Sequence, residues 1–279
     1  MPKGLSSIAH QRFSLCAGEA IRGVRVHIKH LIPAAVLWVI ITAIGETLLL
    51  ANLFPTVGSF EADDFDFIFR FLLALGIPVF AMVIAVIAYS MYAFRSGTGD
   101  EMGATIRGNG WFPRIWIAVT GALAAFIMVY PGMTGLHKLQ TDRSAYGWGD
   151  ENADVVIHAT GAQFNWTFTF ADGTEVNILK GKELVLPVDT KVRFNINSVD
   201  VIHSLWIPAF RMKIDAIPGR TTYMTVEPKV LGAYESDQSF RVQCAELCGL
   251  DHSVMNFPIR VVDRAEFDQW LASLKTGAK

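Results

Sequence analysis

The stretch Gln163–Phe170, QFNWTFTF, decides the fold class of the second half of the chain. Aromatic residues take every second position in it and polar residues take the positions between them; the aromatic set is Phe164, Trp166, Phe168 and Phe170. Successive side chains of a β-strand point to opposite faces of a sheet, so this alternation predicts a strand with one buried face. The turn sequence Ala171–Gly173 follows directly and ends the strand. An all-β domain is therefore expected in this part of the chain.

Further short runs of apolar and β-branched residues continue downstream of this strand. Turn residues such as Pro187, Asp189 and Pro218–Gly219 separate the runs, which read EVNIL, ELVLP, KVRFNIN, DVIHSLWIP, TTYMTVE, SFRVQC and FPIRVV. Many short strands at this spacing are typical of a β-sandwich or a small barrel. The closing segment DRAEFDQWLASL has a capping residue, Asp263, and an apolar stripe, so it predicts a short amphipathic helix.

The first half of the chain consists of long apolar runs instead. Hydrophobic residues make up 52% of the sequence and the mean hydropathy is +0.34, which is high for a soluble protein. Three stretches carry this excess, Leu31–Phe54, Phe71–Phe94 and Ile115–Leu136, and Glu46 is the one charged residue within them. Each is long enough for the roughly 20 residues that cross the hydrocarbon core of a bilayer. The sequence therefore predicts three transmembrane helices, at about 31–54, 71–94 and 115–136.

Two other interpretations of these runs are open. Buried core helices of a soluble protein can be equally apolar, but they are shorter and rarely occur three in succession. A cleaved signal peptide could explain the first run, but its apolar core would be only about 7–15 residues long and its leader shorter. We therefore expect a retained helix, with cleavage before about residue 55 as the alternative.

Basic residues around the runs predict their orientation. The segment before the first run is basic, the loop after it (GSFEADDFDFIFR) is acidic, and the loop after the second run is basic again; the bases concerned are Lys3, Arg12, Arg22, Arg25, Lys29, Arg95, Arg107 and Arg114. Basic flanks stay in the cytoplasm. We therefore expect a cytoplasmic N-terminus and a membrane anchor over residues 1–136. A linker near Gln140–Asp150 then opens a domain over residues 137–279, on the periplasmic or outer face of a bacterial inner membrane.

The remaining features of the composition indicate which classes of partner and cofactor are not expected. The net charge is −2 at pH 7 and no basic block occurs, so a nucleic-acid partner is not expected. The motif C-x-x-C-H does not occur, so no c-type haem is attached to this chain. Cys16 stands before the first apolar run without another cysteine nearby, and we expect it to be a free thiol.

The other two cysteines lie in the stretch Gln243–Met255, QCAELCGLDHSVM. It places two thiols, an imidazole and a thioether at short spacings, and three interpretations compete for them. A disulfide between Cys244 and Cys248 suits an extracytoplasmic domain, but it leaves His252 and Met255 without a role. Structural zinc sites use thiolate and imidazole but not usually thioether. Copper takes all four, because soft thiolate and thioether ligands select it and imidazole suits it as well.

A second histidine completes this candidate site. Blue-copper sites use one thiolate, whereas two thiolates have enough lone pairs to bridge two metal ions, and two coppers need a second imidazole. His203, in the run DVIHSLWIP, is the candidate. A histidine in such a run is more often a hydrogen-bonded core residue, but a site that lacks one nitrogen favours the ligand interpretation. Glu246 lies between the two cysteines, and its backbone carbonyl could supply a weak axial contact.

These residues resemble subunit II of haem–copper oxidases, the CuA-bearing subunit of cytochrome c oxidase. The family signature C-x-E-x-C-x3-H-x2-M is matched here by Cys244, Glu246, Cys248, His252 and Met255, and the upstream motif DVIHS supplies His203. The segment KIDAIPGR matches the family as well, and the resemblance covers roughly residues 65–265. It implies N-terminal transmembrane α-helices followed by an all-β cupredoxin-like Greek-key sandwich. It also implies that those six residues hold a dinuclear copper centre, CuA.

The resemblance implies a function for that centre. In the family, the dicopper centre accepts electrons from cytochrome c or another small donor. It passes them to haem in subunit I, where oxygen is reduced to water and protons are translocated. The implied partners are therefore subunit I, subunit III, the donor protein and membrane lipid. The side chain of Glu246 is implied to reach a magnesium ion at the border with subunit I.

Three features depart from the family pattern. The family usually has two membrane helices, whereas three are predicted here. Phe164 stands where the family commonly has the tryptophan at which electrons enter, so Phe164 and Trp166 are the candidates for that role. The sequence FPRIW, with Pro113 and Arg114, stands where the family often has a glutamate ahead of the last membrane helix. No role in proton uptake is therefore carried over.

Rival functions are weighed on the same residues. A quinol oxidase subunit shares the scaffold but lacks the copper ligands, which are intact here. The CuA-bearing subunit of a nitric oxide reductase stays open, because subunit I decides the electron acceptor. A membrane-tethered copper-binding protein would need exposed, exchangeable ligands, and the candidate ligands lie in a fixed loop between apolar strands. The respiratory oxidase is the function we expect.

Overall fold

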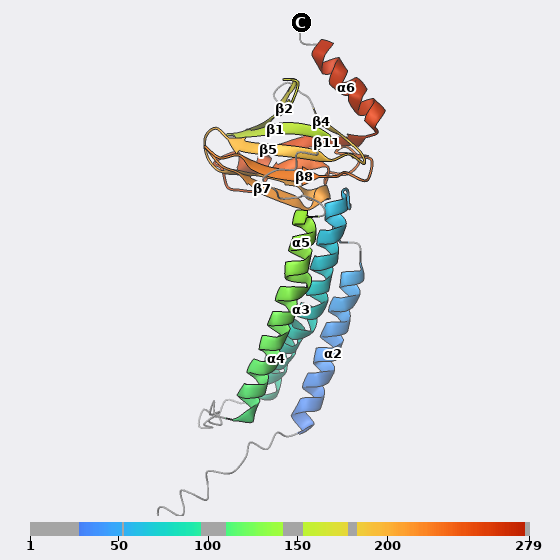
Figure 1. Cartoon of the computed structure of the whole chain (residues 1–279). Helices are drawn as coiled ribbons and strands as arrows, with labels where there is room; N and C mark the ends of the chain where they lie inside the picture. The colour runs from blue at the N-terminus through green and yellow to red at the C-terminus, as the bar shows by residue number, and fades with distance from the viewer. Residues whose placement is uncertain (1–27, 52, 96–109, 142–152, 178–182, 277–279) are drawn as a thin grey trace, which may run out of the picture. The chain divides into compact units, whose positions relative to one another are not determined.

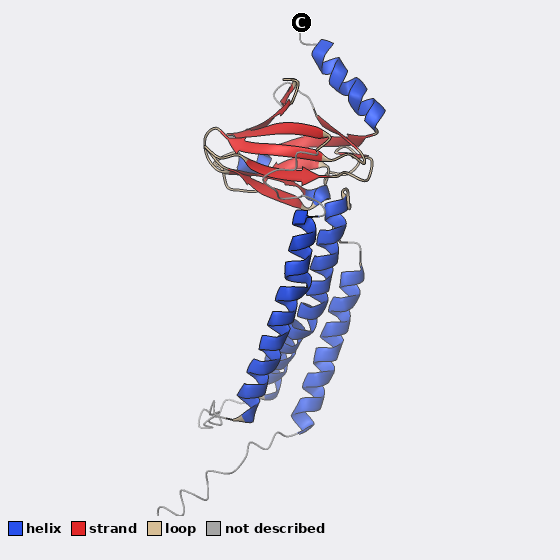
Figure 2. Ribbon diagram, viewed as in Figure 1, coloured by secondary structure: helices blue, strands red, loops and turns tan. Residues whose placement is uncertain are grey.

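The computed structural model describes residues 28–51, 53–95, 110–141, 153–177 and 183–276 (Figure 1). Membrane-type helices occupy the first half and a two-sheet β-sandwich the second (Figure 2). The described residues form two compact units, one made of those up to Ala51 together with Ala74–Ile117 and the other of residues 53–73 together with Ala118 onward. Cys16, most of the N-terminal bases, Arg107 and most of the predicted linker lie outside the described residues.

Three of the described helical segments are long and apolar enough to cross a membrane, His30–Leu50, Phe60–Ala93 and Pro113–Gln140. They belong to α2 (Ile28–Leu50), α3 (Phe60–Ala93) and α4 (Trp111–Ile127), the last continued by a π-helical stretch, Met128–Met133, and by α5 (Thr134–Thr141). The helices predicted from the apolar runs are therefore present, but their bounds differ from the predicted ones.

Helix α3 begins at Phe60, well before the predicted Phe71, so most of the acidic segment GSFEADDFDFIFR is helical rather than a loop. The side-chain oxygen of Ser59 accepts a hydrogen bond from the backbone N–H of Ala62 (3.2 Å), which satisfies one of the free donors at the start of the helix. Acidic residues in the first turn, Glu61 and Asp63, also interact favourably with the positive end of the helix dipole. Apolar periodicity alone could not find this start, because the first turns are polar.

The two other membrane helices also depart from the predicted spans. Helix α2 ends at Leu50 rather than at Phe54, and Pro55 follows shortly, a residue that disfavours helix in the residue before it. The third helix is interrupted at Tyr130, whose φ of −133° and ψ of 120° are not helical. Pro131 follows and has no backbone N–H to continue the hydrogen-bond ladder, so the third span contains a kink that the apolar run did not indicate.

The sandwich consists of a five-stranded sheet and a six-stranded sheet. The first has the order β3-β2-β1-β5-β8, with bounds Glu175–Asn177, Asn165–Phe170, Val155–Ala162, Val192–Ser198 and Thr222–Val226. The second has the order β4-β11-β10-β6-β7, with bounds Leu184–Pro187, Asn256–Val262, Arg241–Cys244, His203–Ile207 and Met212–Ala216. A short strand, β9 (Gly232–Ala233), pairs with β11.

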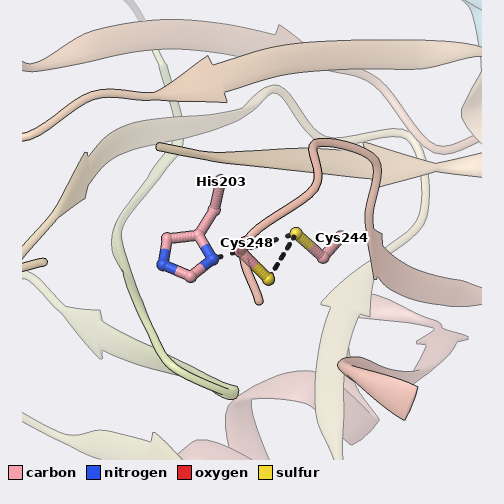
Figure 3. Close-up of side chains that lie close together, drawn as sticks. All are labelled: His203, Cys244 and Cys248. Carbon is pink, nitrogen blue, oxygen red and sulfur yellow. Dashed lines mark hydrogen bonds between the residues drawn. The ribbon is translucent and has the colours of Figure 1, made fainter. Parts of the chain in front are cut away.

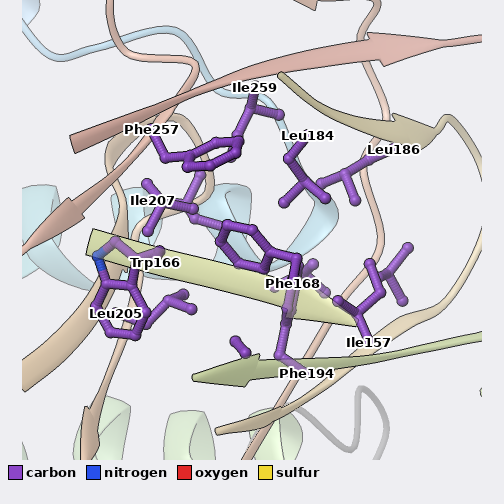
Figure 4. Close-up of a cluster of buried hydrophobic side chains, with 14 of the residues drawn as sticks. Ile157, Trp166, Phe168, Leu184, Leu186, Phe194, Leu205, Ile207, Phe257 and Ile259 are labelled. Carbon is purple, nitrogen blue, oxygen red and sulfur yellow. The ribbon is translucent and has the colours of Figure 1, made fainter. Parts of the chain in front are cut away.

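From Asn165 onward the stretch QFNWTFTF behaves as its alternation predicts, whereas Phe164 precedes β2 and is only half-buried. Trp166, Phe168 and Phe170 of β2 are buried and the residues between them are not, so one face of the strand is in the core (Figure 4). The ring of Phe168 packs edge-on against Phe257 of the other sheet, with centroids 5.0 Å apart. Such aromatic pairs between the two inner faces bury large apolar areas, and they hold the two sheets together.

Each of the predicted strand runs contains a strand among the described residues, although Ile178 and Leu179 of the run EVNIL lie outside them, and three of the described strands were not predicted. The three are β1, β7 and β9. Strand β1 reads VVIHATGA, in which small and polar residues dilute the alternation, yet it lies at the centre of its sheet between β2 and β5. Position in a sheet is set by pairing with distant strands, which local pattern does not report.

The closing helix is confirmed as α6 (Arg264–Thr276). The carboxylate of Asp263 accepts a hydrogen bond from the backbone N–H of Glu266 (2.9 Å), which is the predicted cap. The buried ring of Phe267 lies 6.2 Å from that of Phe170, centroid to centroid, so the apolar stripe of the helix packs on the end of β2.

The first turns of α3 are fastened to the sandwich within the second unit. The backbone N–H of Gly58 donates to Ala209 (2.8 Å), and that of Phe60 donates to Glu227 (3.1 Å). The guanidinium of Arg211 donates two hydrogen bonds to the carboxylate of Asp66, at 2.8 and 3.1 Å. We call this contact region the α3 junction; it comprises residues 55–66, 208–211 and 227–229.

Candidate metal centre

The predicted ligands converge at one end of the second sheet. Strands β6 and β10 are antiparallel neighbours in which Cys244 pairs with Leu205, so the start of β6 and the end of β10 lie together. His203 begins β6 and Cys244 ends β10. With Cys248 they form a group whose possible ligand atoms all lie within 4.8 Å of one another (Figure 3).

The two cysteines of this group are free thiols, and both are buried. Their sulfur atoms are 3.8 Å apart, whereas the sulfurs of a disulfide are about 2.05 Å apart. The disulfide interpretation therefore does not describe this structure. Metal–sulfur bonds of about 2.3 Å allow two sulfurs at this separation to reach the same ion. Each thiolate would then keep lone pairs with which to bridge to a second ion.

Each sulfur has its own nitrogen neighbour. The Nδ1 atom of His203 is 3.8 Å from the Sγ of Cys244, and the Nδ1 atom of His252 is 3.5 Å from the Sγ of Cys248. The predicted weak donors are also close: the backbone carbonyl oxygen of Glu246 lies 3.2 Å from the Sγ of Cys244, and the Sδ of Met255 lies 3.8 Å from that of Cys248. The structure thus brings together all six residues that the sequence selected.

Burial differs among these residues in a way that matters for their chemistry. His203 and Met255 are buried, His252 is half-buried, and the side chain of Glu246 is exposed although its carbonyl faces the sulfurs. Burial, together with the neighbouring Cys244 thiol, raises the pKa of Cys248 to about 11. When a metal ion binds a thiol in this environment, the metal ion displaces the proton and the sulfur binds as a thiolate.

Backbone hydrogen bonds hold the ligand loop in place. The N–H of Cys244 donates to the carbonyl of Met255 (3.0 Å), which closes the loop at its base, and the N–H of Ala245 donates to Ser204 (2.9 Å). Gly249 has a φ of +134°, and a Cβ atom there would lie 3.0 Å from the ring of Phe164. Glycine is therefore required at this turn by both backbone conformation and space.

Asp200 is a residue of the site that the sequence reasoning missed. Its carboxylate accepts hydrogen bonds from the Nε2 of His203 (2.8 Å) and from the backbone N–H groups of Val201 (2.6 Å) and Gln163 (2.7 Å). Burial opposes ionisation, but these hydrogen bonds hold the pKa of Asp200 at about 2. The charged carboxylate orients the imidazole so that Nδ1 faces Cys244. Its position three residues before His203, inside the motif DVIHS, was the available signal.

The two aromatic candidates for electron transfer lie differently. Trp166 is buried, and its ring makes an edge contact with that of His203 (centroids 6.0 Å apart). Phe164 is only half-buried, and its ring lies so close to Gly249 of the ligand loop that a Cβ atom there would be 3.0 Å from it. The adjacent side chain of Gln163 donates from Nε2 to the carbonyl of Cys248 (2.5 Å). Of the two aromatics, Phe164 is the one that reaches the surface beside the site.

Comparisons with known proteins point to one family. Residues 155–262 match the family described as cytochrome C oxidase subunit II, periplasmic domain, and all six converging residues fall within that range. The chain is 32% identical over 200 residues to cytochrome c oxidase subunit 2 of Alkalihalophilus pseudofirmus, covering 72% of this chain. It spans only about half of that relative (54% of its length).

Two further similarities concern an archaeal relative and a solved structure. Haem–copper oxidase subunit 2 of Aeropyrum pernix is 30% identical over 205 residues, which cover 72% of this chain and 85% of that protein. The crystal structure of the periplasmic domain of subunit II of cytochrome oxidase of Bradyrhizobium japonicum is 35% identical, covers 46% of this chain and 98% of that one, and superposes with a TM-score of 0.41.

Proposed function

Because this chain belongs to the cytochrome c oxidase subunit II family, we propose that it receives electrons at a dinuclear copper centre and passes them to haem in subunit I. The immediate donor in this proposal is cytochrome c or another small redox protein. The final acceptor is oxygen, which subunit I reduces to water with coupled proton translocation. The chain is a subunit of a haem–copper oxidase and a membrane protein with an extracytoplasmic sandwich, and the electron path through it is the proposed part.

The observation that carries the proposal is that the sulfurs of Cys244 and Cys248 lie side by side, and the other four candidate donors lie next to one or the other of them. The donor set fits copper, because it combines two soft thiols, two imidazoles, a thioether and a carbonyl, and thioether is unusual for zinc. His203, Cys244, Cys248, His252, Met255 and the carbonyl of Glu246 would hold the ions. When bound, a dicopper centre supplies a one-electron redox couple in which the electron is shared by both ions.

The protein supplies rigidity and exclusion of water around this centre. His203 and Cys244 are fixed by paired strands, and the loop that carries the other ligands is closed by the hydrogen bond from Cys244 to Met255. Ligands held in this way move little when the charge of the site changes, which keeps the barrier to electron transfer low. The buried sulfurs are also kept from water and oxidants.

Three further roles complete the proposal. The exposed side chain of Glu246 is available to bind magnesium at the border with subunit I. The half-exposed ring of Phe164, in contact with the ligand loop, is the proposed point at which electrons arrive, with Trp166 behind it.

The excess of bases before the first helix supports a cytoplasmic N-terminus. Subunits I and III, the donor protein and lipid are the proposed partners.

Copper loading of the full chain in detergent tests the proposed centre. We expect two copper ions per chain and the hyperfine pattern of one electron shared by two copper nuclei in electron paramagnetic resonance. Cys248→Ser removes one of the two thiols that would hold the ions, so the shared-electron pattern should disappear from this variant. A single copper with the pattern of an isolated ion in the unmodified chain would contradict the dinuclear centre. Zinc retained in preference to copper would contradict the assignment of the metal.

A further inference from the structure

The start of α3 and the helix α5 lie side by side (Figure 1), and a cavity lies between them. Its volume is about 270 Å³, close to the lower end of the usual range for ligand pockets, about 300–1,000 Å³. All the residues that line it belong to the second compact unit, and none is a candidate metal ligand. They are Asp64, Phe67 and Ile68 of α3 together with Tyr130, Pro131, Thr134, Gly135 and Lys138.

Packing within the chain fixes the walls of this cavity. The ring of Tyr130, at the interruption of the third span, makes an edge contact with that of Phe71 (centroids 5.7 Å apart) and lies 6.2 Å from that of Phe126. Nearer to the sandwich, Gly135 lets α5 approach α3 closely, because a Cβ atom there would lie 2.5 Å from the Cδ1 of Ile68. The cavity therefore has a shape that does not depend on a ligand. Such π-helical stretches frequently occur at functional sites.

The end of the cavity nearer to the sandwich carries one charge of each sign. The ammonium group of Lys138 donates to the Oδ1 of Asp64 (2.5 Å); the lysine is half-exposed and the aspartate is largely buried. An ammonium group has three N–H donors, of which this ion pair uses one, and a carboxylate can accept several hydrogen bonds. The two side chains can therefore bind a further pair of charges, an anion at Lys138 and a protonated amine at Asp64.

The other end of the cavity is apolar. Phe67 and Tyr130 line it, both rings are exposed, and both residues belong to segments long and apolar enough to cross a membrane. Tyr130 precedes Lys138 by eight residues, which corresponds to roughly 12 Å along a helix axis. Aromatic side chains are typical of the border between headgroups and hydrocarbon. A ligand that fits both ends is charged at one end and apolar at the other.

We propose that this cavity binds a zwitterionic phospholipid with a primary amine in its headgroup, such as phosphatidylethanolamine. The phosphate accepts from Lys138, the ammonium group donates to Asp64, and an acyl chain runs along Phe67 and Tyr130. A headgroup without net charge suits two side chains whose charges cancel, whereas Asp64 repels an anionic headgroup. A quaternary ammonium group, as in phosphatidylcholine, has no N–H to donate to the carboxylate. This site goes beyond the proposed electron transfer and does not depend on copper.

Lipid binding to the full chain in detergent tests this site. Native mass spectrometry measures the affinity for phosphatidylethanolamine, phosphatidylcholine and phosphatidylglycerol with the same dioleoyl chains. Phosphatidylethanolamine should bind about tenfold more tightly than phosphatidylcholine, because only the former makes the charged hydrogen bond to Asp64. Phosphatidylglycerol, whose headgroup is anionic, should also bind more weakly than phosphatidylethanolamine.

Two substitutions separate the roles of the two charges. Lys138→Met removes the donor to the phosphate and should weaken the binding of all three lipids by about tenfold. Asp64→Asn removes the charged acceptor, so it should weaken the binding of phosphatidylethanolamine by about tenfold and strengthen that of phosphatidylglycerol. Lys229→Met is the matched control, since Lys229 pairs with Asp63 of the same helix (2.5 Å) but is not among the lining residues. It should leave all three affinities unchanged.

A substitution without any change of charge tests the cavity itself. Thr134→Leu enlarges a lining side chain and keeps both charges, so it should weaken the binding of phosphatidylethanolamine. Circular dichroism of each variant checks that its helices and sandwich are folded. An unchanged affinity in folded Thr134→Leu would place the lipid outside the cavity and overturn the proposal.

The unmodified chain gives the first decision, because no variant has to fold for it. Equal affinities for the three lipids would indicate unselective contact with the surrounding bilayer, and tighter binding of phosphatidylglycerol would indicate a purely cationic site; either result overturns the proposal. Equal losses in Lys138→Met and Lys229→Met would place the lipid elsewhere. Parallel losses in Lys138→Met and Asp64→Asn with every lipid would show that their ion pair only supports the fold.

Discussion

At the scale of single residues, Asp200 is a side chain outside the candidate ligand set that orients one of the candidate ligands. Its carboxylate accepts from one imidazole nitrogen of His203 and so leaves the other nitrogen facing the sulfur of Cys244. It also accepts from the backbone of Gln163, whose side chain holds the carbonyl of Cys248. Asp200 therefore fixes the orientation of His203 and, through Gln163, also supports the loop that carries Cys248.

We predict that Asp200→Asn weakens copper binding by about 10-fold to 100-fold, the range found for partners of ligating histidines. An amide has only one acceptor oxygen, so its NH2 group must face one of the N–H donors that the carboxylate now accepts from. Competition with a copper chelator measures the affinity. Asp215→Asn, at an exposed position on the neighbouring strand β7, is the control and should not change it. Equal affinities for the two variants would remove Asp200 from the site.

At the scale of elements, the α3 junction packs the first turns of α3 against the β-sandwich within the second unit. Every N–H direction of the Arg211 guanidinium is used there. It donates to Asp66, and also to the backbone carbonyls of Pro55 (2.6 Å), Thr56 (3.1 Å) and Pro208 (2.8 Å). Asp66 and Arg211 are both largely buried, so this ion pair is screened less than one on the surface.

Arg211→Met should lower the free energy of unfolding of the chain by about 3 kcal/mol, because it leaves the Asp66 carboxylate and three carbonyls without their donor. Chemical denaturation of the detergent-solubilised chain, followed by tryptophan fluorescence, measures the change. Arg264→Met is the matched control: Arg264 pairs with Asp268 on the exposed face of α6, where such pairs contribute about 0.5 kcal/mol or less. Similar losses for both variants would show that the junction does not depend on the guanidinium.

At the scale of the whole molecule, the sequence predicts which side of the membrane each part occupies. Cysteine chemistry offers a direct test, because Cys244 and Cys248 are buried and Cys16 precedes the first helix. A membrane-impermeant maleimide should not label Cys16 in cells with an intact inner membrane, and should label it once that membrane is opened. This follows from the excess of bases that keeps the N-terminal segment in the cytoplasm.

The control for this labelling experiment places a cysteine on the opposite side of the membrane from Cys16. Ala272→Cys, in a Cys16→Ser background, puts an exposed cysteine on α6 of the sandwich, and it should be labelled in intact cells. The predicted orientation is wrong if Cys16 is labelled first. An absence of label on Cys16 under all conditions, in a chain shortened at its N-terminus, would instead show that the first segment is cleaved.

The sequence by itself determined the membrane helices, most of the strands and the set of candidate ligands. Apolar runs long enough for a bilayer predict helices, and the alternation in QFNWTFTF predicts a strand, because both follow from periods of the local backbone. The stretch Gln243–Met255 carries five of the six candidate ligands within one loop, so the chemistry that these residues suit can be inferred without knowing the fold. The types of these residues and their spacing indicated a metal site in which two thiols, an imidazole and a thioether are the candidate donors.

Only the tertiary structure decided how strands and candidate ligands that are distant in the sequence come together. His203 is 41 residues from Cys244 in sequence, and they meet because β6 pairs with β10. The hydrogen bond from Gln163 to Asp200 and the pairing of β1 with β5 depend likewise on partners that are distant along the chain. Such contacts are set by which strands pair and which faces pack, and local periodicity carries no record of either.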